Sequence, residues 1–439
     1  MMRAIMRQLL LSDVLLVTAI LVVASGVAAN AAAHTSKSAA AAGASVASAS
    51  LAHSGWDATW AASPMAPTAL LPNLAVAGFN DQTVRNVIFT SVGGSELRVR
   101  LSNTFGTSAL HVGRVSVGIV LTGAQLVPGT THTVTFGGHS SVTLPAGAEA
   151  FSDPLSMTVS PLEVLAVSLY LPVATGTATY HGSAQQTNYV ASGDHAGDVS
   201  PAAYTTTATS WYFLDGVDVR NAHSPGSVVA FGDSITDGFA SQDGANDRWP
   251  NFLARRLDAK FGAEAPGVVD EGIGGNRVLT DSACFGVSAL ARFNRDVLSQ
   301  TGVRDVILLE GINDIGFSQG PNAGCFAPNT DVSAIQIING YEQLIGQAHA
   351  HGLKIFGATL TSFEGAGYWS SAAEAKREAV NDWIRTSGAF DGVIDFARAA
   401  QDAQDPLYFN PAYNSGDNLH PNDAGYEAMA NAINLALLK

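Results

Sequence analysis

The sequence predicts an all-β sandwich followed by an α/β domain that is built on a parallel sheet. Up to about residue 222, apolar residues fall in short β-rich runs broken by Gly, Pro and Asn, which is typical of a sandwich of jelly-roll type. After residue 226, short strands that are apolar throughout alternate with amphipathic helices, as in a parallel sheet covered on both faces. With 439 residues, of which 47% are hydrophobic, the chain is long enough to form two cores.

The first residues have the order of a secretory signal. Arg3 and Arg7 precede the apolar run Val14–Val27, and small residues follow it. We therefore expect a signal peptide over residues 1–31 and export of the mature protein, to the extracellular space or the periplasm. A membrane anchor is the alternative, but the run is short for the ~20 apolar residues that a transmembrane helix needs. We expect no stable membrane anchor.

Residues 32–53 are nearly all Ala, Ser and Gly, which predicts a flexible linker. We place the β-sandwich domain at residues 54–222. In Leu97–Leu101 apolar and charged residues alternate, which predicts one face in a core and the other in water. The predicted strands are Val84–Val92, Leu97–Ser102, Val112–Leu121, His132–Phe136, Met157–Val159 and Val164–Leu171.

We place the α/β domain at residues 226–439. In such a domain active sites collect where strands end and helices begin, because the loops converge there and helix N-termini present free amides. The predicted strands are Val228–Phe231, Val306–Leu309 and Lys354–Leu360. The predicted helices are Trp249–Phe261, Ile335–Ala350 and Ala372–Arg385.

Charge and cysteine content exclude several classes of function. The formal net charge is −15, with 22 basic against 37 acidic residues, whereas a protein that binds nucleic acid needs clustered Lys and Arg. Cys284 and Cys325 are the only cysteines, and in an oxidising compartment we expect a disulfide between them. Two buried free thiols are the alternative. A metal site needs more ligands than two thiols supply, so we expect no metal.

Three residues have the types that nucleophilic catalysis needs. Ser234 lies in a glycine-rich turn directly after the first predicted strand of the α/β domain. A serine hydroxyl needs a base, and His420 stands near the C-terminus with Asp417 three residues ahead of it. Such a carboxylate can orient the imidazole and stabilise its charged form. The alternative role for Asp417 is a helix N-cap or a turn.

The oxyanion of an ester-hydrolysis intermediate needs hydrogen-bond donors, each worth ~3 kcal/mol. Asn313 follows the Val306–Leu309 strand and offers its side-chain amide, or serves as a turn residue. Gly274 and Gly275 offer unobstructed backbone amides, and Ser234 can add its own amide.

These segments, in this order, resemble the four sequence blocks of the SGNH hydrolases, also called GDSL esterases and lipases. The resemblance spans residues 228–439 and implies a flavodoxin-like, three-layer α/β/α fold. The N-terminal half resembles the β-rich domain that precedes this fold in some secreted bacterial members. The implied catalytic residues are Ser234, Asp417 and His420, and the implied oxyanion hole is formed by Ser234, Gly275 and Asn313. Ile235 stands where the family has leucine, a volume-conserving change.

Other polar residues near the motifs receive different interpretations. Asp233, Asp237 and Asp314 are expected to brace the catalytic loops through hydrogen bonds rather than take part in the chemistry. Ser318 lies in a Gly-x-Ser-x-Gly pattern and is a rival nucleophile, but a loop follows it where that elbow needs a helix.

The sequence thus predicts a serine ester hydrolase that works through an acyl-serine intermediate and needs no cofactor. An acyl ester on a polysaccharide, such as acetyl-xylan, is the expected substrate, because the protein is predicted to be exported and has no long amphipathic lid. The alternatives are a lipid or phospholipid acyl hydrolase and a general short-chain esterase. A hypothesis of another class is a non-catalytic glycan-binding protein whose aromatic residues stack on sugars.

Overall fold

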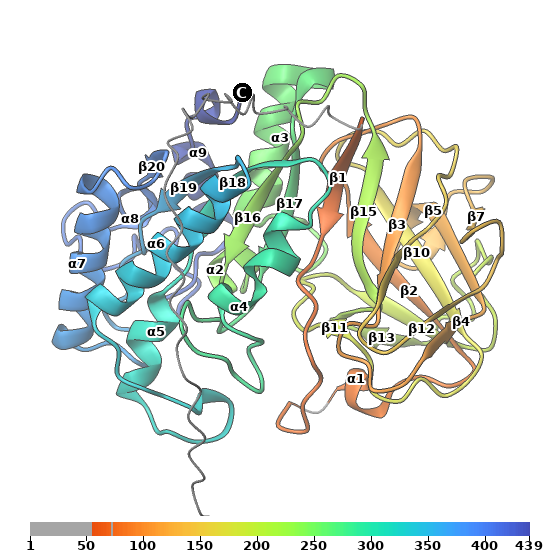
Figure 1. The fold of residues 1–439 in the computed structure, drawn as a ribbon, viewed down its shortest axis with the longest axis horizontal. Helices are drawn as coiled ribbons and strands as arrows, with labels where there is room; N and C mark the ends of the chain where they lie inside the picture. Colours follow the sequence, from red (N-terminus) through yellow and green to blue (C-terminus); the bar gives the residue numbers. More distant parts are fainter. Residues whose placement is uncertain (1–54, 72) are drawn as a thin grey trace, which may run out of the picture. The chain divides into compact units, whose positions relative to one another are not determined.

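The computed structural model describes residues 55–71 and 73–439 (Figure 1). The predicted signal peptide and linker lie outside these residues. The described residues belong to one compact unit, 52–439. None of its described helices has the length and apolar content that spanning a bilayer requires.

Two antiparallel sheets build the N-terminal half, which confirms the predicted β-rich sandwich. The first sheet has the order β1 (Trp56–Ala61), β15 (Leu214–Arg220), β3 (Leu97–Ser102) and β9 (Glu149–Phe151). The second has the order β13 (Thr206–Ala208), β12 (Asn188–Ser192), β2 (Gln82–Phe89), β10 (Val164–Leu171), β5 (Arg114–Thr122) and β6 (Gln125–Leu126), and β7 (His132–Val134) also pairs with β5. Apolar side chains of both sheets share one core.

Short elements complete this half of the chain. Two small antiparallel pairs join β11 (Tyr180–His181) to β14 (Trp211–Tyr212) and β4 (Leu110–Val112) to β8 (Val142–Leu144). A single helical turn, α1 (Leu74–Ala77), begins after Asn73, whose side chain caps it.

Two predicted strands differ from the observed ones. The run Val112–Leu121 is divided at Gly113, because β4 pairs with β8 whereas β5 pairs with β10. The segment Met157–Val159 is not a strand and makes a single bridge, from Val159 to Gly94. Pro154 and Pro161 flank this segment, and proline has no amide N–H for a strand ladder.

The charged face of β3 is not in water, contrary to the prediction. Arg100 is buried; its Nε donates to Asp215 Oδ1 at 2.9 Å and its Nη2 to Gln300 Oε1 at 3.3 Å. Arg98 donates from Nη2 to Thr301 Oγ1 at 3.3 Å. Both arginines therefore face the C-terminal half, so the alternation marks a polar interface between the two halves and not a solvated surface.

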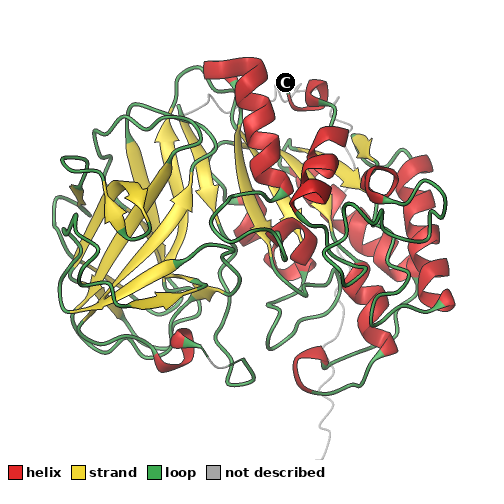
Figure 2. Ribbon diagram, turned by 180° about the vertical axis from the view of Figure 1, so that it is seen from behind, coloured by secondary structure: helices red, strands yellow, loops and turns green. Residues whose placement is uncertain are grey.

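A parallel sheet with helices on both faces forms the C-terminal half (Figure 2). Its order is β17 (Gly267–Gly272), β16 (Ser227–Gly232), β18 (Val303–Leu309), β19 (Lys354–Ala358) and β20 (Gly392–Ile394). In chain order this is 2-1-3-4-5, the flavodoxin-like arrangement that the resemblance implied. The helices are α2 (Ser234–Asp237), α3 (Trp249–Phe261), α4 (Ala289–Phe293), α5 (Ile312–Gly316), α6 (Ala334–Ala350), α7 (Ser371–Thr386), α8 (Phe396–Ala400) and α9 (Asp423–Ala432).

The two halves join through backbone and side-chain hydrogen bonds where β1 packs beside β17 (Figure 1). The Ala58 amide donates to the Thr301 carbonyl at 3.0 Å, and Ser227 Oγ donates to the Ala58 carbonyl at 3.1 Å. The Val268 amide donates to Ser91 Oγ at 2.8 Å. The sandwich therefore packs directly against the parallel sheet, although the two sheets remain separate.

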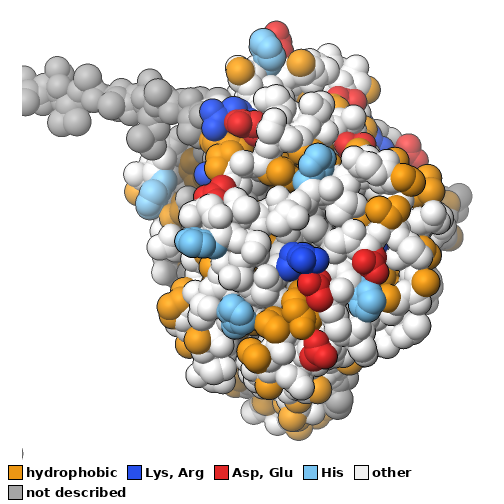
Figure 3. Space-filling model, turned by 90° about the vertical axis from the view of Figure 1, so that its right-hand side faces the viewer, with side chains coloured by type: hydrophobic (Ala, Val, Ile, Leu, Met, Phe, Trp, Pro, Cys, Tyr) orange, Lys and Arg blue, Asp and Glu red, His pale blue; other side chains and the backbone are white. Residues whose placement is uncertain are grey.

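The outward face of the sandwich carries no gathered positive charge. In Figure 3 the few Lys and Arg side chains on this face lie apart from one another, and Asp and Glu side chains lie among them. Hydrophobic side chains are scattered in small groups on the same face. This face thus has no basic patch of the kind that binds phosphate backbones.

Candidate active site

Three loops at the carboxyl ends of neighbouring strands bring the predicted residues together. Ser234 is the first residue of α2 and follows β16, Gly275 follows β17, and Asn313 lies in α5 after β18. Because β16 lies between β17 and β18, these loops meet at one edge of the sheet. The chain at Gly232 passes so close to β18 that a Cβ there would lie 2.2 Å from the Leu309 carbonyl oxygen. Only glycine fits this turn.

Ser234, His420 and Asp417 form a continuous chain of hydrogen bonds. Ser234 Oγ lies 2.8 Å from His420 Nε2, and His420 Nδ1 lies 2.6 Å from Asp417 Oδ2. His420 comes from the loop before α9, 186 residues after Ser234. Ser234 is 7% exposed and His420 is 9% exposed, so the pair is sheltered from water but reachable from a cavity. The arrangement can move the serine proton to a histidine that a carboxylate orients.

Asp417 is held as an anion by its own loop. Partial burial would raise the pKa of Asp417, but hydrogen bonds from the His420 ring and from two backbone amides lower it well below its usual range. The amides of Leu419 and His420 each donate to Asp417 Oδ1 at 2.9 Å. The carboxylate therefore stays charged beside the imidazole and stabilises its protonated form.

The three residues expected to supply oxyanion donors, Ser234, Gly275 and Asn313, line one cavity. Gly275 adopts φ +76°, and a Cβ there would lie 2.5 Å from the Phe285 ring, so glycine is required. The Gly274 amide is engaged, because it donates to Asp237 Oδ2 at 3.0 Å. Asn313 Nδ2 donates to the Asn276 carbonyl at 3.0 Å, and its second hydrogen is left to face the cavity that Asn313 lines. Ser234 adds the amide at the start of α2, and the set is suited to an oxyanion.

Two buried aspartates, Asp233 and Asp314, hold these loops through hydrogen bonds. Asp233 Oδ1 accepts from the Ile235 amide at 2.9 Å and caps α2. Asp314 accepts from the amides of Val278 and Leu279 at 2.7 and 3.1 Å. Burial raises the pKa of Asp233 to about 7 and the pKa of Asp314 to about 6. Each of these carboxyl groups therefore accepts hydrogen bonds from the backbone of a loop at the site.

The sequence of this half matches a known family. Residues 230–428 match the model of the GDSL-like Lipase/Acylhydrolase family. The chain carries a GDSL-like acylhydrolase domain. The family assignment agrees with the resemblance that the four sequence blocks predicted.

Solved structures of other proteins are similar to part of the chain. One is a GDSL-like lipase from Bacteroides thetaiotaomicron, with 19% identity, a TM-score of 0.34, and coverage of 48% of this chain and 87% of that chain. Another is a variant of an acetyl xylan esterase from Geobacillus stearothermophilus, with 20% identity, a TM-score of 0.38, and coverage of 50% of this chain and 95% of that chain. Among curated proteins, none matches this sequence.

A cavity of about 690 Å³ opens above Ser234 and His420. The acylhydrolase domain and the sandwich both line it, and most of the lining surface is apolar. The lining residues of the acylhydrolase domain include Phe239, Phe285, Phe317, Phe326, Tyr368 and Leu419. Those of the sandwich half are Met65, Leu71, Asn73, Tyr180, Gly182, Ser183, Thr209 and Ser210.

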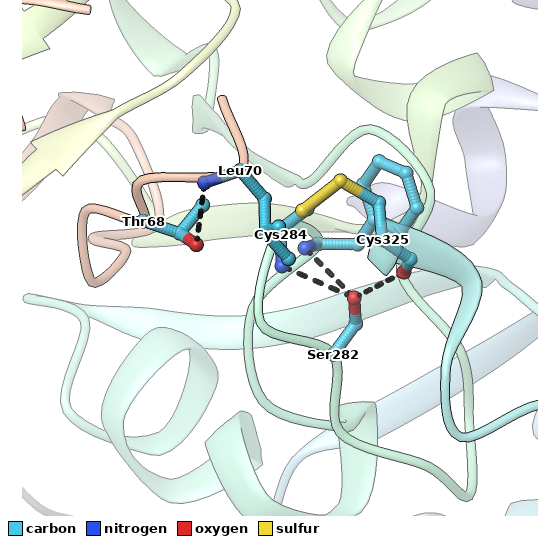
Figure 4. Close-up of a disulfide and its surroundings, with 6 residues drawn as sticks. Thr68, Leu70, Ser282, Cys284 and Cys325 are labelled. Carbon is cyan, nitrogen blue, oxygen red and sulfur yellow. Dashed lines mark hydrogen bonds between the residues drawn. A yellow bond between two sulfur atoms is a disulfide. The ribbon is translucent and has the colours of Figure 1, made fainter. Parts of the chain in front are cut away.

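A disulfide between Cys284 and Cys325 fixes one wall of this cavity, as the sequence predicted. Ser282 Oγ accepts from the amides of Cys284 and Phe285 at 3.2 Å each and donates to the Cys325 carbonyl at 2.8 Å (Figure 4). The Phe285 ring packs against the rings of Phe317 and Phe326, with centroids 5.5 and 6.0 Å away. The crosslinked loop thus carries an aromatic cluster to the mouth of the site.

The rival nucleophile has a different environment. Ser318 lies in a 3₁₀ turn, Phe317–Gln319, and its hydroxyl donates to the Ile315 carbonyl at 3.0 Å. The segment follows α5 rather than a strand, so it does not form the strand-to-helix elbow that such a serine requires.

Sequence reasoning missed the residues that the sandwich supplies. Met65 and Leu71 line the cavity, and His181 lies 3.1 Å from Asp237. They sit in loops and in a two-residue strand, more than fifty residues from any motif of the acylhydrolase domain. No local pattern marks them, because their position depends on how the two halves pack.

Proposed function

We propose that this protein is an exported serine ester hydrolase that works through an acyl-serine intermediate. The observation that carries the proposal is the hydrogen-bond chain from Ser234 through His420 to Asp417, which ends in an apolar cavity. Ser234 Oγ attacks the ester carbonyl while His420 Nε2 takes its proton. His420 then gives that proton to the leaving alcohol, and a water molecule activated by His420 releases the acid.

The oxyanion that forms at each step receives hydrogen bonds from the chain's own donors. We assign these to the amides of Ser234 and Gly275 and to Asn313 Nδ2. Tyr368 supports the orientation of Asn313, since its hydroxyl lies 3.4 Å from Asn313 Oδ1. Because one Nδ2 hydrogen of Asn313 is donated to the Asn276 carbonyl, we assign the other to the oxyanion.

For the substrate, we propose an acyl ester on a neutral polysaccharide, such as acetyl-xylan. The predicted export of the protein, its β-sandwich and its net charge of −15 support a neutral extracellular polymer. In this interpretation the small acetyl group occupies part of the cavity next to Ser234, and the sugar chain crosses its mouth.

A second candidate is an ester with a larger apolar group, as in a lipid or a general esterase substrate. The cavity lining favours it, because aromatic and aliphatic side chains from both halves surround Ser234. Three large apolar residues of that lining, Leu71, Phe239 and Phe326, are at least 40% exposed. Such a rim suits an apolar substrate.

The deciding experiment compares the mature protein with its Ser234→Ala variant. Acetate release is measured from acetylated xylan, pectin and chitin, and turnover from p-nitrophenyl acetate and p-nitrophenyl octanoate. Ser318→Ala serves as the matched control, and we expect it to keep wild-type activity. Ser234→Ala should lose at least about 10⁴-fold in kcat.

The pattern of substrates separates the candidates. Acetate from one polysaccharide supports the first candidate, and a preference for octanoate over acetate esters supports the second. If Ser234→Ala turns over as fast as the wild type, the serine mechanism is wrong. Retention on a polysaccharide column with no turnover of any ester would instead favour a glycan-binding protein.

A further inference from the structure

A histidine of the sandwich reaches into the acylhydrolase domain. His181, the second residue of β11, is only 4% exposed. Its Nε2 lies 3.1 Å from Asp237 Oδ1, and its Nδ1 lies 2.9 Å from the carbonyl oxygen of Ser63. Its ring packs against Trp211, with centroids 5.4 Å apart, and Trp211 Nε1 donates to the Val87 carbonyl at 2.7 Å. The imidazole is therefore held rigidly at the boundary between the two halves.

Asp237 connects this histidine to the candidate oxyanion hole. Its Oδ1 faces His181, and its Oδ2 accepts from the Gly274 amide at 3.0 Å. Gly274 directly precedes Gly275, whose amide we assign to the oxyanion. Asp237 also ends α2, the short helix that begins with Ser234. A shift of this carboxylate would move the Gly275 amide relative to the serine hydroxyl.

We propose that His181 is a positioning residue for the oxyanion hole. By donating from Nε2 to Asp237, it fixes the carboxylate that holds the Gly274 amide, and so sets the direction of the Gly275 amide. This inference rests on the proposed serine esterase function. It gives the sandwich a part in catalysis beyond forming a wall of the cavity.

The surroundings of His181 favour its doubly protonated form. Both ring nitrogens face acceptors, a carboxylate and a carbonyl, and a neutral imidazole can donate from only one nitrogen. Burial lowers the pKa of His181, but the Asp237 carboxylate and the hydrogen bond to the Ser63 carbonyl together raise it more, so the net shift is upward. Arg248 opposes this shift, and Asp270 of β17 is a further nearby acid, whose pKa burial raises to about 7.

The charge of His181 predicts how kcat responds to pH. As the pH rises through the raised pKa of His181, the ring loses one proton and can keep only one of its two hydrogen bonds. The Asp237 carboxylate is a stronger acceptor than the Ser63 carbonyl, so the neutral ring keeps its proton on Nε2 and its bond to Asp237. The positioning role is therefore retained at high pH, and residue 181 should add no alkaline fall to kcat.

Two amide variants separate the two hydrogen bonds of His181. The side-chain amide of His181→Gln reaches about as far as Nε2, so it can still donate to Asp237, whereas His181→Asn reaches about as far as Nδ1 and can donate only to Ser63. With p-nitrophenyl acetate as the probe, we expect His181→Gln to keep most of kcat. His181→Asn should lose about 10- to 100-fold in kcat, because small misplacements of a catalytic group cost up to about that much, with little change in KM.

Control variants separate this role from a structural one. His139→Asn changes an exposed histidine of the same half and should leave kcat unchanged. Asp237→Asn removes the carboxylate and should reproduce the loss of kcat seen in His181→Asn. The double variant should lose no more kcat than either single variant, because both substitutions break the same hydrogen bond between His181 and Asp237. The comparison of Asp237→Asn with the wild type remains decisive if a His181 variant does not fold.

The result that overturns the proposal is wild-type kcat in His181→Asn, or equal losses of kcat in the Gln and Asn variants. Ser234→Ala is assayed in parallel to keep the two proposals apart. Turnover that survives in Ser234→Ala would refute the serine mechanism itself. Loss of turnover in Ser234→Ala beside normal turnover in His181→Asn would refute only the positioning role.

Discussion

The two halves of the described chain contribute to the same cavity in different ways. The acylhydrolase domain supplies Ser234 and His420, which lie 2.8 Å apart at the end of a parallel sheet. The sandwich supplies apolar wall residues such as Met65, and the buried His181 that contacts Asp237. Reacting atoms tolerate little displacement, so their residue types and spacing are tightly constrained. Wall and bracing residues need only suitable shape and polarity, so they leave no motif.

The largest expected effect tests whether the chemistry belongs to the acylhydrolase domain alone. Asp417→Asn replaces the carboxylate that accepts from His420 Nδ1 at 2.6 Å and removes its charge. We expect kcat to fall by about 10³- to 10⁴-fold, because an amide no longer fixes the tautomer or stabilises the imidazolium. Asp417 is 42% exposed at its side chain, so the melting temperature should change little.

Steady-state kinetics and thermal unfolding check this prediction side by side. Asp382→Asn, an exposed aspartate on α7, is the control and should match the wild type in both measurements. A loss of less than tenfold in Asp417→Asn would show that His420 does not depend on this carboxylate.

The second prediction concerns the buried charges that join the halves. Arg292 is fully buried in α4; it donates to Ser63 Oγ at 2.9 Å and to the Gly232 carbonyl at 2.8 Å. Arg292→Met removes the cation that lies 3.2 Å from the buried Asp296 carboxylate and 3.5 Å from Glu310. We expect the free energy of unfolding to fall by about 3–5 kcal/mol, as is typical when one partner of a buried ion pair is removed.

The pH dependence of this loss has a definite sign. Burial raises the pKa values of Glu271 and Glu310, so both favour the protonated form in the folded state. Between pH 5 and pH 8 these groups ionise in the unfolded chain but resist ionisation when folded, so stability falls as the pH rises. Without Arg292 the pKa values of Glu271 and Glu310 rise further. The loss of unfolding free energy in Arg292→Met should therefore be larger at pH 8 than at pH 5.

Urea denaturation at the two pH values measures the effect. Arg385→Met is the matched control, because the pair between Arg385 and Asp395 is about one-third exposed and should contribute less than about 1 kcal/mol. Equal losses in the two variants would contradict a special role for the buried network.

The smallest expected effect tests the wall that the sandwich provides. Met65 lines the cavity and is 5% exposed, so Met65→Ala removes apolar contact from the substrate side. We expect KM for p-nitrophenyl octanoate to rise by about tenfold, since each buried methylene group is worth about 1–3 kcal/mol in such pockets. KM for p-nitrophenyl acetate should stay close to that of the wild type.

Leu121→Ala is the control for this variant, because Leu121 is 55% exposed on β5 and is not among the residues that line the cavity. A parallel rise in KM for both esters would indicate a general loss of the site's shape. If KM does not change for either ester, the substrate contacts only the acylhydrolase domain.

Local patterns predicted several elements well. The strand Val164–Leu171 and the helix Trp249–Phe261 have the predicted bounds, because each carries an unbroken apolar pattern of the right period. Patterns failed where pairing partners decide the structure. Val112–Leu121 is two strands because its ends pair with different neighbours, and Arg100 is buried because another domain covers its face.

The sequence by itself determined the residue types of the candidate site and the class of fold around it. Ser234 and Asn313 could be found because each follows a strand that local apolar periodicity already defines, and His420 because it stands just before the last helix with Asp417 three residues ahead of it. Only the tertiary structure decided what encloses them. His181 contacts Asp237, which lies 56 residues later in the chain. Met65 lines the same cavity as the disulfide-linked loop that begins at Cys284, more than two hundred residues later. Such contacts follow from the packing of two separately patterned sheets, and no local pattern encodes that packing.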